Sequence, residues 1–239
     1  MADRFKAQLD NFRNEVGAVA RFIYIDDAVN HAASRSRRVL NRLNDTPTMW
    51  LSIFNACQMA AYVSLGRIFD HTSKYNLGAL VKLVESDLTV FGRAELAVRK
   101  REGSSLNPAR LAEYLDAAYY PTQADVRWLK EKEKRYRAIY DRAIRPVRNK
   151  YLAHRVRIAP EEVASLYEAG LVRELWHLSA SLLELHHALW QLYHNGKKPR
   201  LRPVRYSPKA MFDGERYPSG EHEHVVEEVK AFVHWLENV

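Results

Sequence analysis

An arginine, an asparagine and a histidine lie within the seven residues Arg148-Asn149-Lys150-Tyr151-Leu152-Ala153-His154. Histidine can donate or accept a proton near neutral pH, and arginine keeps a planar positive fork that matches phosphate oxygens. A nuclease that works without a metal needs both, because one group must move the proton of the attacking 2′-hydroxyl while a cation stabilises charge on the phosphate. The pattern therefore favours chemistry on RNA. By itself, such a pair is also typical of an ordinary solvated helix face.

The element that must position these residues is a long, charged helix predicted over residues 123–155, with a kink at Pro146. Six steps of an ideal helix, at about 100° each, place His154 about 240° round the axis from Arg148. Either the helix is distorted near Pro146 or ends before His154, or the arginine wraps round, or two subunits share the site. We favour a distorted helix combined with a shared site.

Apolar residues recur at steps of three and four along most of the chain, which is the helical period. Only nine glycines and nine prolines interrupt 239 residues, so an all-α fold is expected. Predicted helices cover residues 2–34, 34–44, 47–70, 77–86, 94–103, 108–119, 123–155, 160–169, 171–194 and 221–238. The run Asp45-Thr46-Pro47 supplies a capping residue and a first-turn proline at one helix start. We expect a helical bundle over residues 1–196, then a basic extended segment and a terminal helix over 197–239.

The run from Met49 to Gly66 carries no charge, but polar residues interrupt it and its length is at the lower edge for a membrane span. An apolar stripe through Trp50, Cys57 and Phe69 predicts a buried central helix packed on several neighbours. The first residues contain no apolar signal region, and the single cysteine allows no intrachain disulfide. A cytoplasmic protein without a membrane anchor is expected.

The chain resembles the HEPN superfamily of helical proteins, whose motif is an arginine, a polar residue and a histidine four to six residues beyond the arginine. Arg148, Asn149 and His154 fit this motif. Together with Leu65-Gly66-Arg67-Ile68-Phe69-Asp70, the segment is most similar to the abortive-infection branch of the AbiU type. The likeness covers roughly residues 1–195.

This resemblance implies a bundle with long antiparallel helices that forms a homodimer, so that two motifs face one cleft. It implies a metal-independent endoribonuclease acting in phage defence or as a toxin, with a 2′,3′-cyclic phosphate and a 5′-hydroxyl as product ends. Arg148 would contact the scissile phosphate, His154 would act as acid or base, and Asn149 would position groups. Because other members only bind, the alternative is a non-catalytic module for nucleotide, RNA or a protein partner.

Three residues are predicted to support the motif. Arg67 and Asp70 are three apart, so an intrahelical ion pair or a cap is the default interpretation. In the alternative interpretation, Asp70 approaches the motif helix and orients His154 or Arg148, with His71 as a further contributor. Tyr151 lies inside the motif, but core packing explains it better than a functional role.

A formal net charge of +8 permits a polyanionic partner. RNA contacts are expected from Lys150 and Arg155, and from Arg200, Arg202 and Arg205 in the basic segment, which otherwise is a linker. An antitoxin or another defence protein is a further candidate partner, although Val156 replaces the tyrosine that some antitoxins modify. His187 and His194 share a helix face, but no known ligand pattern surrounds them, so neither a metal nor a cofactor is expected.

Overall fold

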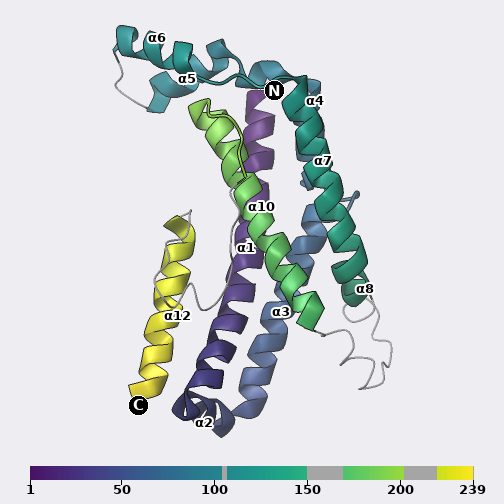
Figure 1. Cartoon of the computed structure of the whole chain (residues 1–239), viewed down its shortest axis with the longest axis vertical. Coiled ribbons are helices and arrows are strands. Elements are labelled where there is room, and N and C mark those ends of the chain that lie inside the picture. Colours follow the sequence, from purple (N-terminus) through teal and green to yellow (C-terminus); the bar gives the residue numbers. More distant parts are fainter. Residues whose placement is uncertain (104–106, 150–168, 202–219, 239) are drawn as a thin grey trace.

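Two long antiparallel helices form the axis of the molecule. α1 (Ala2–Arg35) leads to α2 (Arg37–Asp45), which turns the chain, and α3 (Pro47–Phe69) returns beside α1 (Figure 1). The structure is a computed structural model that describes residues 1–103, 107–149, 169–201 and 220–238. Within these ranges the secondary structure is helical and contains no strand, which confirms the predicted all-α class.

The remaining elements pack on this pair of helices or on one another. They are α4 (Leu77–Ser86), the 3₁₀ helix η1 (Leu88–Phe91), α5 (Arg93–Gly103), α6 (Pro108–Ala117), α7 (Gln123–Ile139), the π-helix η2 (Tyr140–Ile144), α8 (Arg145–Val147), α10 (Ala169–Asn195) and α12 (Gly220–Asn238). α10 crosses α1 and reaches from η2 at one end to α5 at the other (Figure 1). The helix predicted over 160–169 lies outside the described residues.

Several helices begin where local capping chemistry places them. The Asn76 side chain accepts a hydrogen bond from the Ala79 N–H at 2.8 Å, and Thr122 forms a reciprocal capping box at the start of α7. Pro47 occupies the first turn of α3 as predicted. The capping position within the run Asp45-Thr46-Pro47 is Thr46, because Asp45 ends α2, and the Thr46 side chain forms no capping hydrogen bond.

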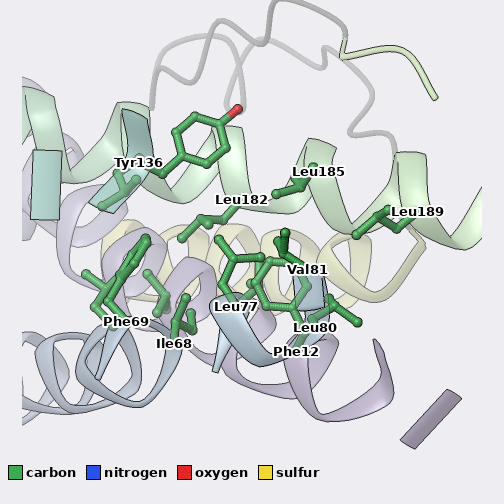
Figure 2. Packing of buried hydrophobic residues seen from close by; sticks show 14 of the residues in the cluster. Phe12, Ile68, Phe69, Leu77, Leu80, Val81, Tyr136, Leu182, Leu185 and Leu189 are labelled. Carbon is green, nitrogen blue, oxygen red and sulfur yellow. The ribbon is translucent and has the colours of Figure 1, made fainter. Parts of the chain in front are cut away.

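The main core lies where α10 packs across α1, α3, α4 and α7. Figure 2 shows leucines of α10 above apolar side chains of the other helices, namely Phe12, Ile68, Phe69, Leu77, Leu80 and Val81. Each fully buried side chain of this size contributes roughly 1.5–3 kcal/mol to stability. This core fixes the end of α3 against α4 and α7, and therefore positions the residues that follow Phe69.

A second core attaches the terminal helix to the bundle. Val229, Val233 and Leu236 of α12 are buried against apolar residues of α1 and α2, including Tyr24 and Val39. The terminal helix is thus packed against the bundle, and its separation as a unit from residue 197 onward stays a prediction.

α3 packs on several neighbours as predicted, namely α1, α2, α4 and η2, but one of its faces is exposed and the helix is not buried all round. Cys57, Ala61, Leu65 and Phe69 are buried as expected, whereas Leu51, Met59 and Val63 are 62%, 46% and 41% exposed. Neighbouring helices pack on one side of α3 and leave the other side to solvent. No helix in the part of the chain that the structure describes is long and apolar enough to cross a membrane.

Candidate functional site

Arg148 follows a stretch of helix with altered hydrogen bonding. α7 continues into the π-helix over Tyr140–Ile144, and Pro146 comes two residues later. A proline has no N–H and its ring clashes with the carbonyl four residues earlier, so a regular α-helix cannot pass through it. Bonds to the fifth residue relieve this conflict. The expected distortion near Pro146 is confirmed, and the ideal 100° step does not hold here.

The Arg148 guanidinium forms a two-pronged ion pair with Asp70 at the end of α3. Nη1 donates to Asp70 Oδ1 and Nη2 lies beside Oδ2, each at 2.9 Å. Nη1 also donates to the Tyr140 hydroxyl at 2.8 Å. The hydrogen bonds to Asp70 raise the pKa of Arg148 above its ordinary value, so the guanidinium stays charged. The two side chains are 28% and 35% exposed, which leaves the pair at the surface and open to solvent.

Gly66 provides the surface on which this guanidinium lies. A Cβ atom added at Gly66 would be 2.7 Å from both Cζ and Nη1 of Arg148. Because real Cβ contacts are essentially never this short, only glycine lets the arginine approach α3 so closely. The position of Arg148 therefore depends on a missing side chain one turn before Asp70.

Comparison with protein families gives one match, the AbiU2 family of HEPN domains, over residues 2–208. The chain belongs to the AbiU2 family. The resemblance inferred from Arg148, Asn149 and His154 is thereby confirmed, and with it an abortive-infection context. No curated protein and no solved structure matches the chain. All residues of the candidate site lie inside the matched range.

Tyr140 is a residue of this candidate site that the sequence did not identify. Its ring stacks on Phe69 with the centroids 4.9 Å apart, and the side chain is 1% exposed. Burial raises the pKa of Tyr140, so the hydroxyl stays protonated while its oxygen accepts from Arg148. The only sequence signal is a spacing of eight residues, about two helical turns, which many core tyrosines share.

Arg137 links the same site to the start of α4. Its Nη1 donates to the Phe69 carbonyl at 2.5 Å and lies 3.2 Å from His71 Nε2. Because a guanidinium can only donate, this imidazole nitrogen is the acceptor in the contact. Arg137 also pairs with Glu133 at 2.6 Å. His71 thus lies next to Asp70 in sequence but contacts Arg137.

The other predicted site residues divide into three groups. Arg67 pairs with Glu15 of α1 at 3.2 Å, so the predicted ion pair between Arg67 and Asp70 is wrong. Asp70 instead pairs with Arg148, as in the alternative interpretation. Asn149 is exposed beside Arg148. The remaining motif and RNA-contact residues lie outside the described residues, namely Lys150, Tyr151, His154, Arg155, Arg202 and Arg205.

Arg200 is described but lies away from Arg148. The backbone of Gly196 accepts a hydrogen bond from Tyr119 at 2.6 Å, and Lys198 lies over the Tyr119 ring. The basic segment therefore starts next to the residues that follow α6, at the opposite end of α10 from α8 (Figure 1). A helix of 27 residues is roughly 40 Å long. The structure therefore does not bring Arg200 to the motif.

The histidines of α10 do not assemble a metal site in the described part of the chain, where no group of three His, Cys, Asp or Glu side chains is suitably placed. Burial lowers the pKa of His186 to about 4 and also lowers that of His194. His186 packs against Phe12, with ring centroids 6.2 Å apart. It is a neutral core histidine.

Proposed function

We propose that this AbiU2-family protein is a metal-independent endoribonuclease of the HEPN type that acts in phage defence. The observation that carries the proposal is the fixed position of Arg148. The motif arginine is held by Asp70, Tyr140 and Gly66 at a partly exposed site, with Asn149 next to it in solvent. A fixed cation at a developing phosphate charge costs no reorganisation during reaction, which is how such groups accelerate phosphoryl transfer.

In the proposed reaction, His154 removes the proton from a 2′-hydroxyl, whose oxygen attacks the adjacent phosphorus. Arg148 stabilises the charge that develops on the phosphate oxygens. The bond to the 5′-oxygen of the next nucleotide breaks, and that oxygen receives a proton. The products are a 2′,3′-cyclic phosphate and a 5′-hydroxyl.

One observation favours the alternative, a binding module without catalysis. Asp70 occupies both terminal nitrogens of Arg148, which is also how a structural ion pair looks. In that case the exposed edge of the site would hold RNA, a nucleotide or a protein partner, and no bond would be cut.

Labelled tRNA, rRNA and mRNA incubated with the purified protein in chelator separate these functions. Wild type should cleave, and Arg148→Ala and His154→Ala should each lose at least about 100-fold in rate, the usual loss for one catalytic group. His234→Ala, exposed on α12, is the control and should retain activity. Absence of cleavage by wild type on all three RNAs would exclude the ribonuclease.

The proposed homodimer, with Arg148 of one subunit working with His154 of the other, has its own test. Equal amounts of the Arg148→Ala and His154→Ala variants are mixed and allowed to exchange subunits. A shared site restores part of the activity, because mixed dimers contain one intact pair. If neither mixing nor refolding together restores cleavage, while wild type is active, each subunit uses its own pair.

A further inference from the structure

A pocket of about 580 Å³ lies between α4 and α7, a short distance along the chain from the Arg148 site. α4 lines it with positions 78, 81, 82 and 85, and α7 with positions 130, 133, 134 and 137. Both sets have the spacing of a single helix face, so the pocket is a groove that follows the two helices. We call it the α4–α7 groove.

Basic side chains predominate in the α4–α7 groove, with Lys82, Lys130, Lys134 and Arg137 against two glutamates. Glu85 pairs with Lys130 at 2.8 Å and the other glutamate, Glu133, pairs with Arg137. Lys82 and Lys134 are exposed and form no ion pair within the described ranges of the chain. The groove therefore retains two positive charges, one on each helix.

The groove is joined to the Arg148 site through Arg137. Arg137 and His71 line one end of the groove, and Arg137 donates to the carbonyl of Phe69, the residue before Asp70. Lys130 lines the other end, seven residues earlier on α7, which corresponds to about 10 Å. Lys134 lies between them. A chain that leaves Arg148 along the groove would thus meet cations at successive positions.

We propose that the α4–α7 groove binds the phosphate backbone of the RNA strand on one side of the cleaved bond, with Lys82 and Lys134 contacting phosphate oxygens. This inference rests on the proposed function. Cationic grooves that follow a single strand provide affinity without reading sequence, and base recognition is added by aromatic rings on which bases stack. Among the residues that the structure describes, no phenylalanine, tyrosine or tryptophan lines the groove. Its binding is therefore independent of base sequence.

The test is binding of a 2′-O-methyl RNA oligonucleotide, which cannot be cleaved, measured by fluorescence anisotropy on the full chain at several salt concentrations. The double variant Lys82→Ala/Lys134→Ala should bind at least 10-fold more weakly. Its plot of log affinity against log salt should be shallower by about 1.4, because each phosphate contact on a single strand contributes about 0.7. Poly-U and poly-A oligonucleotides should lose affinity equally.

The matched control is Lys6→Ala/Lys132→Ala, which removes the same charge from positions outside the groove. This variant should keep the wild-type salt slope. If the two double variants bind alike, the groove makes no RNA contact. If adenosine monophosphate binds wild type as tightly as the oligonucleotide and loses affinity in the groove variant, the groove holds a nucleotide and the strand proposal is overturned.

These experiments distinguish failure of the groove proposal from failure of the ribonuclease proposal. A protein that binds RNA through the groove but cuts none contradicts the ribonuclease and supports the groove. A protein that cuts RNA, while its groove variant binds like wild type, contradicts the groove alone. Circular dichroism of both double variants establishes that the helices are intact, as expected for lysines that are exposed or, for Lys132, half-buried.

Discussion

At the scale of single residues, the candidate site depends on how closely Arg148 can approach α3. The arginine lies on Gly66, pairs with Asp70 and donates a hydrogen bond to the Tyr140 hydroxyl, so three residues determine the position of one guanidinium. The pair with Asp70 alone would be worth little if it were fully solvated. The partly buried guanidinium forms two contacts with Asp70 and one with Tyr140, which fix its orientation better than a single solvated ion pair would.

Gly66→Ala is therefore expected to reduce RNA cleavage at least 10-fold, because the new methyl group displaces the guanidinium from Asp70. Gly17→Ala is the control, since a Cβ at Gly17 in α1 meets no atom within 4 Å. That substitution should raise the free energy of unfolding by up to about 1 kcal/mol through helix propensity and leave cleavage unchanged. Equal cleavage by the two variants would show that Arg148 needs no close approach.

The sequence predicted Arg148, Asn149 and His154 because the motif is local. It offered two roles for Asp70, an ion pair or a cap on its own helix and a contact with the motif helix. Asp70 does occupy the C-terminal capping position of α3, but its ion pair is with Arg148 and not with Arg67. The choice depends on how α3 and α8 are placed by the core around Phe69, which no local pattern encodes. Tyr140 was missed for the same reason, since its role exists only through contacts with Phe69 and Arg148.

At the scale of elements, the helix that carries Arg148 changes its hydrogen bonding before Pro146. A proline in sequence predicts a kink, but whether the helix bends, breaks or widens into a π-turn depends on the packing of the preceding residues. Here Tyr140 and Ile144 of the π-helix are buried, so their packing in the core determines that the helix widens. Helix starts were easier to predict, because caps such as Asn76 and Thr122 act within four residues.

Pro146→Ala tests whether the π-helix sets the position of Arg148. Alanine restores the missing N–H and removes the clash, so a regular α-helix becomes available and turns Arg148 away from Asp70. Cleavage should fall at least 10-fold while the melting temperature stays the same or rises. Pro108→Ala, in the first turn of α6, should leave cleavage unchanged. A Pro146 variant with full activity would mean that the π-helix is not needed.

At the scale of the whole molecule, acidic residues lie in the packed region between α1, α3 and the terminal helix. Asp26 accepts a hydrogen bond from Gln58 of α3 at 3.1 Å, and Tyr24 is buried in the core shared with α12. In Asp27, the residue after Asp26, the Oδ2 atom is buried and has no hydrogen-bond partner among the described residues. Burial, with a smaller contribution from Asp26, raises the pKa of Asp27 from 3.8 to about 6.

Because the pKa of Asp27 is higher in the folded protein, the native state binds more protons than the unfolded state between pH 3.8 and about 6. The free energy of unfolding therefore falls as the pH rises from 3.8 to about 6, because the buried carboxyl becomes charged. The shift corresponds to about 3 kcal/mol at pH 7, and solvent around this half-buried carboxyl reduces it, so Asp27→Asn should raise the free energy of unfolding by about 2 kcal/mol at pH 7 and leave it unchanged near pH 4. Urea unfolding at several pH values measures this, with exposed Asp10→Asn as the control. Parallel pH profiles for wild type and Asp27→Asn would contradict the shift.

The paired state of Arg148 has a consequence for any phosphate that binds there. Asp70 already occupies both terminal nitrogens, so an anion that needs them competes with a carboxylate inside the same molecule. The apparent dissociation constant then equals the intrinsic constant divided by the fraction of molecules in which the arginine is released. If the arginine were released from Asp70 in one molecule in 100, the apparent affinity would be about 100-fold weaker than the affinity of the released arginine. An anion that needs both nitrogens therefore binds more weakly than it would to an unpaired arginine held in the same position.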